Sequence, residues 1–229
     1  LRAKMKNRVR FRSSTPCEEV YKSADRYGLA FKDEEGLKKQ EFDSVILACP
    51  AYATGKMLAP AFSELAKKIS AIPYSAMCVT AQGYKKPAPP QLNAFGYLVP
   101  SSQPAPILGT LFSSSIYPSR APENCFSLRC MQGGGKNPEI LKLADDELLR
   151  LIVKENKDTL GIDYAPDFHR VIRWPKAIPR YEKGHWKIVR DIEACTADEA
   201  LFITGNAFYG VSMNDCVVTA VSTAEKVKK

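Results

Sequence analysis

The chain has few of the residues and motifs that mark several common classes of enzyme. Only two histidines occur, and neither His169 nor His185 has a carboxylate or a cysteine at the spacing of a zinc site. No GxSxG string indicates a serine hydrolase, and Asp191 with Glu193 is more typical of a solvated face than of an acid–base pair. These absences argue against zinc chemistry and against hydrolysis by a catalytic triad.

Long apolar runs and paired cysteines are also missing. No run approaches the roughly 18 apolar residues of a membrane-spanning helix, we expect no signal peptide, and the seven cysteines include no CxxC. The odd number of cysteines and the apolar neighbours of Cys49, Cys78 and Cys130 predict free thiols in a reducing compartment. We therefore expect a cytoplasmic protein, and we expect any contact with a membrane to be peripheral.

Positive charge is in excess but is not gathered into a block. The net charge is +8, with 33 lysines and arginines against 25 acidic residues. Near the start, basic and apolar residues alternate as in a half-exposed strand, unlike a nucleic-acid-binding tail. The basic ones are Lys4, Lys6, Arg8, Arg10 and Arg12, and the apolar ones are Met5, Val9 and Phe11. Because no RNA-binding or zinc-finger signature occurs either, we expect no nucleic-acid partner.

The remaining patterns predict a globular α+β chain. Its 229 residues and 45% hydrophobic content are sufficient for one domain or two modest ones. Strands are predicted at residues 9–12, 27–32 and 42–49, the last fully buried, followed by a helix over residues 50–70 broken at Pro60. A mostly antiparallel sheet of about five strands is predicted next, from residues 74–84, 95–99, 107–112, 125–131 and 168–174. A helix with Asp145 as its N-cap is expected to end near Gly161 and to pack on that sheet.

The most informative segment lies near the end of the chain. Residues 201–216 read LFITGNAFYGVSMNDC, which predicts a strand, a glycine-rich loop and a helix that continues almost to Lys229. Such a unit places free backbone N–H groups and the positive end of the helix dipole together. It suits an anion or an electron-rich ring. Any strand–turn–helix unit of an α/β domain has a similar pattern, so the segment alone does not fix a function.

Four further segments accompany it in order along the chain. They are FDSVILACP (42–50), FGYLVPSSQ (95–103), ILGTLF (107–112) and AIPRYEKGHW (177–186). Together the five segments resemble those of the oxygen-dependent protoporphyrinogen and coproporphyrinogen oxidases, which are FAD-containing enzymes of the amine-oxidase-like flavoprotein superfamily. The resemblance covers most of the chain.

The resemblance implies a cofactor, a substrate and residues that contact each, but it assigns no catalytic residue. It implies FAD, in contact with Val9, Trp186, Gly205, Asn206, Gly210, Val211, Ser212 and Met213. It also implies a porphyrinogen, in contact with Phe95, Gly96, Leu98, Leu111 and Met131. A tetrapyrrole is a flat apolar disc with acidic arms, so apolar side chains and a cation at the rim suit it. Core packing is the competing interpretation for Leu111 and Met131, whereas Gly96 indicates that another group approaches the backbone closely.

Two parts of the family pattern do not occur in this chain. The GxGxxG turn that holds the FAD pyrophosphate is absent, and so is the arginine that faces a substrate carboxylate. The chain therefore resembles the C-terminal half of such an enzyme, and we expect it to bind FAD weakly or not at all by itself.

The resemblance also predicts a division of the chain. Residues 1–50 would be part of an FAD-binding domain, residues 51–190 a porphyrinogen-binding domain, and residues 191–229 the last strand and helix of the FAD-binding domain. The fold expected is α+β, with the mostly antiparallel sheet and its helices flanked by a remnant of a Rossmann-like FAD domain of the GR2 type. The strands at 42–49 and 201–204 should then share one sheet.

The activity implied is oxidation of a porphyrinogen to the porphyrin in haem biosynthesis, with dioxygen as the acceptor, and a homodimer is left open. Two alternatives remain at this point. One is another amine-oxidase-like flavoprotein, such as a relative of the carotenoid desaturases, although FGYLVPSS argues against it. The other is a non-catalytic porphyrin-binding module, which would be colourless until porphyrin is added, whereas an FAD enzyme is yellow as isolated.

Overall fold

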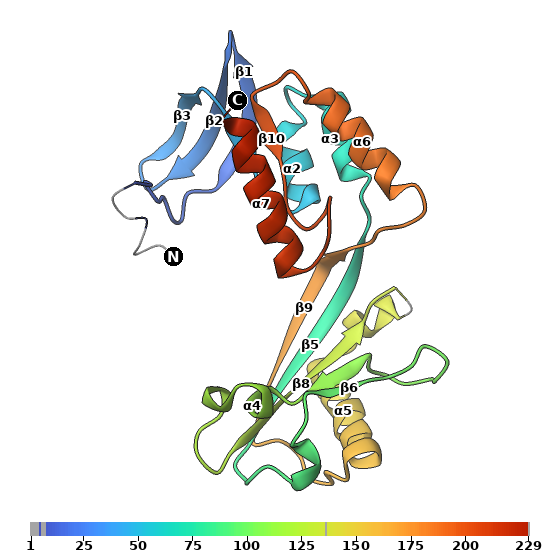
Figure 1. The fold of residues 1–229 in the computed structure, drawn as a ribbon. Coiled ribbons are helices and arrows are strands. Elements are labelled where there is room, and N and C mark those ends of the chain that lie inside the picture. Colours follow the sequence, from blue (N-terminus) through green and yellow to red (C-terminus); the bar gives the residue numbers. More distant parts are fainter. Residues whose placement is uncertain (1–4, 6–7, 136, 229) are drawn as a thin grey trace. The chain divides into compact units, whose positions relative to one another are not determined.

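A computed structural model describes residues 5, 8–135 and 137–228, and the chain divides into two compact units (Figure 1). Unit 1 combines Leu1–Pro73 with Pro179–Lys229, and unit 2 is Tyr74–Ile178. Residues 51–73 and 179–190 thus fold with unit 1, so the expected boundaries after residues 50 and 190 were wrong. The reason is packing, since helix α2 (Ala51–Leu58) lies against strand β1 (Cys17–Ser23), and α3 (Ser63–Ser70) against α6 (His185–Cys195).

Unit 2 is built on a five-stranded sheet. Its strands are ordered β6 (Gly96–Leu98), β7 (Gly109–Leu111), β8 (Phe126–Gly133), β5 (Tyr74–Tyr84) and β9 (Phe168–Pro179). The pairs β6–β7, β7–β8 and β8–β5 are antiparallel. This confirms the mostly antiparallel sheet predicted from alternation, although β9 continues well beyond its expected end at Trp174. Short helical turns connect the strands: η1 (Pro90–Leu92), α4 (Ser113–Ile116), η2 (Pro118–Arg120) and η3 (Pro138–Lys142).

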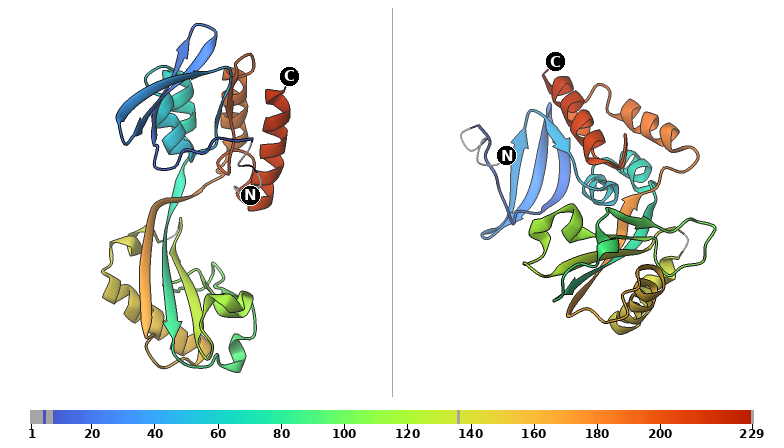
Figure 2. Two further views of the ribbon diagram at one scale, coloured as in Figure 1. Left: turned by 90° about the vertical axis from the view of Figure 1, so that its left-hand side faces the viewer. Right: turned by 60° about the horizontal axis from the view of Figure 1, so that its bottom comes forward.

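Helix α5 (Asp145–Leu160) covers one face of this sheet (Figures 1 and 2). Leu148 of the helix is buried in the cluster that contains Cys78 of β5, and Ile152 in the cluster that contains Cys130 of β8. The helix ends at Gly161, as predicted, in a left-handed conformation with φ 68°. Its N-cap is Ala144 and not Asp145, because the Asp145 carboxylate pairs with Arg173 at 2.5 Å instead.

A buried polar network connects α5 to the sheet. The Asn156 amide donates to Gln82 Oε1 at 2.8 Å and to the Tyr84 hydroxyl at 3.2 Å, and that hydroxyl donates to Gln82 Oε1 at 2.8 Å. The Gln82 amide nitrogen donates to Cys130 Sγ at 3.1 Å. Burial raises the pKa of the Cys130 thiol to about 11, which keeps it neutral at pH 7. Because an unpaired buried polar group is costly, this network favours a single placement of the helix on the sheet.

Unit 1 contains two sheets. Strands β1, β2 (Arg26–Asp33) and β3 (Gly36–Phe42) form an antiparallel meander. Strand β4 (Val45–Leu47) pairs in parallel with β10 (Leu201–Ile203), and Leu201 lies opposite Val45. This pairing confirms that the segments at 42–49 and 201–204 share one sheet.

The unit 1 helices follow the expected pattern in part. Helices α2 and α3 are separate, as the break at Pro60 predicted, and α7 (Met213–Val227) runs almost to the chain end. Helix α6 was not predicted. Its buried side chains, His185, Val189 and Ile192, recur at helical spacing. Strands β1 and β3 were also not predicted.

Two strand predictions in unit 1 were wrong. Residues 9–12 are irregular, because β1 pairs only with β2 and no strand among the described residues lies beside this segment; Lys4 and Lys6 lie outside the described residues. The buried strand expected at 42–49 is only the three residues of β4, with Ile46 47% exposed. Within the described part of the chain, β4 has a single partner strand, which leaves that side chain uncovered. The seven cysteines are all free thiols, as predicted.

Candidate functional site

The loop after β10 has a backbone that requires glycine at two positions. Gly205 has φ 123° and Gly210 has φ 139°, values that other residues rarely adopt. A Cβ added to Gly210 would lie 2.4 Å from the carboxyl carbon of Asp215. The two predicted glycines are therefore needed for the turn into α7, whatever else they contact.

Helix α7 begins with a capping box. The Ser212 hydroxyl accepts a hydrogen bond from the Asp215 N–H, and the Asp215 carboxylate accepts one from the Ser212 N–H, both at 3.0 Å. These bonds lower the pKa of Asp215. Among the described residues, the N–H groups of Met213 and Asn214 have no acceptor. The helix start therefore keeps two free donors, although Asp215 already compensates part of its positive dipole.

An aromatic cluster packs against this loop within unit 1. The rings of Tyr181 and His185 stack at 3.9 Å, and the Trp186 ring meets both edge-on, at 6.0 and 5.4 Å. The Tyr181 hydroxyl donates to the Asn206 carbonyl at 2.8 Å and accepts from the Gly210 N–H at 2.7 Å. The structure thus brings the AIPRYEKGHW segment and the glycine loop together.

His185 is the core of this cluster and is buried. Its Nε2 lies 3.3 Å from the Phe208 carbonyl oxygen. A carbonyl only accepts, so Nε2 carries the proton and Nδ1 is an acceptor. Nδ1 is buried with no partner among the described residues, and so is the hydroxyl of Thr204 at the end of β10. Tyr181 and His185 were not predicted as site residues, although both belong to the AIPRYEKGHW segment. The helical spacing of His185, Val189 and Ile192 is the signal that could have identified His185.

These features fit a flavin ring. Trp186 offers an indole that is 56% exposed, the start of α7 offers free N–H donors, and His185 Nδ1 is an unpaired acceptor. A flat ligand with apolar faces and polar edges satisfies such a set.

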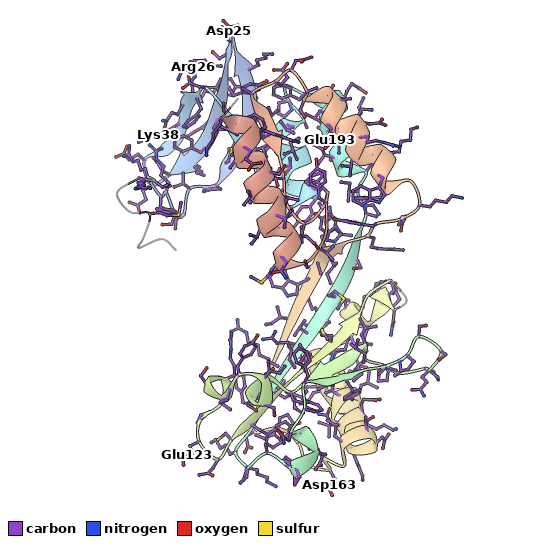
Figure 3. All side chains as sticks on the ribbon, viewed as in Figure 1. Asp25, Arg26, Lys38, Glu123, Asp163 and Glu193 are labelled. Atoms are coloured by element: carbon purple, nitrogen blue, oxygen red, sulfur yellow. The ribbon has the colours of Figure 1, made fainter. Side chains whose placement is uncertain are left out.

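A hydrogen bond also joins the loop to α6. The Tyr209 hydroxyl donates to the Glu193 carboxylate at 2.8 Å (Glu193 is labelled in Figure 3). Burial together with this carboxylate raises the pKa of Tyr209.

Three other residues predicted to contact FAD lie outside the aromatic cluster. Val211 and Met213 are exposed beside the helix start. Val9 lies in the irregular N-terminal segment, and its N–H donates to the Met5 carbonyl at 3.0 Å. Its N–H is therefore already used locally, and among the described residues no hydrogen bond or ring contact joins Val9 to the aromatic cluster.

In unit 2, the predicted substrate residues gather on the sheet face opposite α5. Along β6, β7 and β8, the register places Leu98 beside Gly109 and Met131, and Gly96 beside Leu111. The alternate residues on these strands, such as Cys130, point into the α5 core. Leu98 is 74% exposed, and the adjoining Phe95 is 68% exposed. We call this surface the open face.

The reason for which Gly96 was assigned to the site does not hold. A Cβ on Gly96, whose φ is 142°, would lie 2.2 Å from the Thr110 carbonyl oxygen of β7. The group that approaches its backbone is thus the neighbouring strand. Gly96 remains on the open face beside Leu111, but its lack of a side chain is explained by the sheet itself.

Strand β9 adds apolar side chains that sequence interpretation did not assign. Phe168, Ile172 and Trp174 are exposed, whereas Val171 packs beside Leu148 and Arg173 pairs with Asp145 on the side of α5. Phe168 contacts the position where Gly83 of β5 would carry a side chain. Soluble proteins rarely leave so many apolar side chains on one sheet face unless it binds something. The alternation at 168–174 could have shown this.

Two cavities include none of the residues predicted to contact FAD or the porphyrinogen. One, of about 970 Å³, lies between α6, β10 and α7, and none of the residues predicted to contact FAD lines it. The other, of about 460 Å³, adjoins the open face in unit 2. Among residues 5, 8–135 and 137–228, no cluster of His, Cys, Asp and Glu could hold a metal ion. In the same ranges no helix has both the length and the apolar character needed to cross a bilayer.

The chain is similar to known proteins over most of its length. It is 30% identical over 213 residues to the chloroplastic protoporphyrinogen oxidase of Nicotiana tabacum, which is 88% of this chain and 39% of that relative. It is 25% identical over 193 residues to the coproporphyrinogen III oxidase of Propionibacterium freudenreichii subsp. freudenreichii, which is 81% of this chain and 35% of that relative. It thus spans well under half the length of these curated relatives.

A solved structure and a family match complete the comparison. The putative protoporphyrinogen oxidase from Exiguobacterium sp. 255-15 superimposes with a TM-score of 0.75 at 19% identity, covering 93% of this chain and 46% of that one. At this identity the likeness shows the fold alone. The sequence also matches the family described as flavin containing amine oxidoreductase over residues 2–228. Because that match includes nearly every residue, the chain belongs to the flavin containing amine oxidoreductase family.

Proposed function

We propose that the complete protein is an FAD-dependent oxidoreductase that oxidises a porphyrinogen to the porphyrin in haem biosynthesis, with dioxygen as the acceptor. The substrate would be protoporphyrinogen IX or coproporphyrinogen III, the classes named by the curated relatives. The observation that carries this proposal is the open face of unit 2. Leu98, Leu111 and Met131, selected from the sequence alone, lie together there on adjacent strands.

The open face supplies what a tetrapyrrole requires. Its strands present aliphatic and aromatic side chains on one surface, and successive strands lie about 4.8 Å apart. A disc that covers several strands removes this apolar surface from water, which favours binding by roughly 25 cal/mol per Å². In this proposal Leu98, Leu111 and Met131 hold and orient the ring, and none of them exchanges a proton.

The loop and the aromatic cluster of unit 1 support the cofactor half of the proposal. The chemistry that a bound FAD supplies is acceptance of a hydride from a substrate carbon. Trp186 would contact the ring, and the free N–H groups of Met213 and Asn214 would stabilise negative charge near the start of α7. His185 Nδ1 would accept a hydrogen bond from a donor on the ligand.

The experiment measures two quantities in the complete enzyme: porphyrin formation by fluorescence, and flavin content of the purified protein. Phe95→Ala should raise the apparent substrate constant, by an amount that corresponds to about 1 to 3 kcal/mol of lost apolar contact, while flavin content stays near wild type. Trp186→Ala should instead lower flavin retention.

Leu37→Ala is the matched control, because Leu37 is an exposed apolar residue on β3, outside both sites. It should change neither quantity. If Phe95→Ala and Leu98→Ala both leave the substrate response unaltered, the open face is not the porphyrinogen site. We further propose a cytoplasmic location with at most peripheral membrane contact, and size-exclusion chromatography with light scattering would establish whether the protein is a homodimer.

A further inference from the structure

The cavity of about 460 Å³ in unit 2 adjoins the open face and includes none of the residues predicted from the sequence. Strands β5 and β8, the connection between η2 and β8, and the start of β9 line it. Its size lies within the range of small-molecule sites. We call it the basic groove, for the side chains described next.

Three cations line the basic groove, against one carboxylate. The cations are Lys85, Arg120 and Arg129, and the carboxylate is Asp167. The Asp167 carboxylate accepts the backbone N–H of Lys85 at 2.7 Å. Among the ion pairs formed by the described residues, none involves the three cations. The groove therefore carries net positive charge without an internal partner, which favours an anion.

The walls of the groove are apolar. Phe168 and Pro122 contribute to them, and Gly83 adds a position without a side chain beside Phe168. An inorganic ion makes no favourable apolar contact with such walls. Cations beside apolar surface instead match an amphipathic ligand whose carboxylate is attached to a hydrophobic body.

Arg129 joins the groove to the open face. On β8 it lies directly opposite Leu111 of β7 on one side and Ala81 of β5 on the other. Opposite residues of an antiparallel pair have their Cβ atoms about 5 Å apart. A ligand ring that contacts Leu111 therefore lies within reach of the Arg129 side chain.

We propose that Arg129, with Arg120 and Lys85, forms the carboxylate-binding end of the substrate site and selects a tetrapyrrole that carries free acidic arms. The inference rests on the proposed function, because the ring must lie on the open face for its arm to reach the groove. Arg129 is a specificity-determining residue in this scheme, and it takes no part in electron transfer.

The test compares two probes on the full chain: protoporphyrin IX and its dimethyl ester, which has the same ring without the acidic groups. Binding is followed by quenching of tryptophan fluorescence. Wild type should bind the acid roughly three- to tenfold more tightly than the ester, as expected for a partly exposed charge-assisted pair. Arg129→Gln should remove most of this preference and leave the affinity for the ester unchanged. Arg120→Gln should reduce the preference to a smaller extent.

Arg150→Gln is the matched control. Arg150 is an exposed arginine on α5, against the other face of the sheet, so its substitution removes the same charge without touching the groove and should keep the preference. Leu98→Ala should weaken both probes equally. If wild type binds both probes equally, or Arg129→Gln keeps the acid preference, the groove inference is wrong while the open face stands. If neither probe binds, the porphyrinogen site itself is wrong, and the groove inference fails with it.

Discussion

The two units differ in how completely each covers its own apolar surface. Unit 2 is one continuous segment, and α5 buries one face of its sheet while the exposed apolar residues collect on the other. Unit 1 is assembled from two segments, and its parallel β4–β10 pair has two strands among the described residues. Parallel sheets are normally covered on both faces. Here Ile46 of β4 is exposed, as are Val217, Val218 and Val221 along α7.

This difference indicates that unit 2 holds a nearly finished binding surface, whereas unit 1 supplies only part of one. The curated relatives are more than twice as long as the chain, which spans 39% of the Nicotiana tabacum protein. We infer that the apolar stripe of α7 and the exposed side of β4 are completed by residues that this chain does not supply. The predictions below test that contrast, beginning with the largest expected effect.

The largest effect should be on FAD binding, which depends on the incomplete unit 1. The chain by itself should bind FAD weakly or not at all, because the pyrophosphate-binding GxGxxG turn of the family is not in its sequence. Each missing charge-assisted hydrogen bond removes about 1.5 to 3 kcal/mol, so several together move a tight cofactor beyond the micromolar range. Absorbance of the purified chain in the flavin region measures this. Stoichiometric FAD would show that unit 1 is complete as a cofactor site.

The second-largest effect should be the loss of stability when a core side chain of unit 2 is truncated. Leu148→Ala removes a fully buried side chain between α5 and the sheet, and it should lower the free energy of unfolding by about 2 to 5 kcal/mol. Val217→Ala on the exposed stripe of α7 should change it by no more than about 0.5 kcal/mol. Urea unfolding followed by Trp174 fluorescence in a Trp186→Phe background measures unit 2 for Leu148→Ala, and Trp186 fluorescence in a Trp174→Phe background measures unit 1, which contains Val217. A large loss for Val217→Ala would mean that α7 is already covered within this chain.

The same contrast explains which parts of the fold could be predicted from the sequence. Alternation identified β5 to its exact bounds and the positions of its neighbours, because one face of that sheet is buried and the other exposed. In unit 1 the apolar run at 42–49 predicted a buried strand, but burial of Ile46 needs a cover that the described residues do not provide. The alternation at residues 9–12 had no strand to pair with and did not become one.

The candidate site was predictable to a similar degree. Family motifs selected Leu98, Leu111 and Met131, which the sheet register brings together. They did not select Arg129, because its relation to Leu111 depends on the pairing of β7 with β8, and pairing is a long-range property. His185 was missed for the same reason, since its role depends on the carbonyl of Phe208 far along the chain.

Backbone strain in the loop before α7 should give a smaller effect than the core truncation. Gly210→Ala should lower the free energy of unfolding by about 1 to 3 kcal/mol, because φ is 139° and the new Cβ would contact the Asp215 carboxylate. Gly36→Ala is the control, since Gly36 has φ 118° with no atom within 4 Å and reports strain alone. Trp186 fluorescence in a Trp174→Phe background follows unit 1. We expect Gly210→Ala to lose more stability than Gly36→Ala, and we expect the double variant Gly210→Ala, Asp215→Ala to recover that excess. Equal losses in Gly210→Ala and Gly36→Ala would show that the contact with Asp215 has no energetic cost.

The smallest effect should come from the capping box at the start of α7, and it should depend on pH. Ser212→Ala removes the hydroxyl that accepts the Asp215 N–H and should lower the free energy of unfolding by about 0.5 to 2 kcal/mol, as for other N-cap substitutions.

The hydrogen bonds from Ser212 lower the pKa of Asp215 in the folded chain, so the charged form of Asp215 stabilises the fold at pH values above its unfolded pKa of about 4. That contribution is lost as the pH falls through the lower folded-state pKa. The stability difference between wild type and Asp215→Asn should therefore be constant from pH 5 to 7, by the same rule, and should vanish in stronger acid. A pH-independent difference for Asp215→Asn would mean that the capping box does not form in solution.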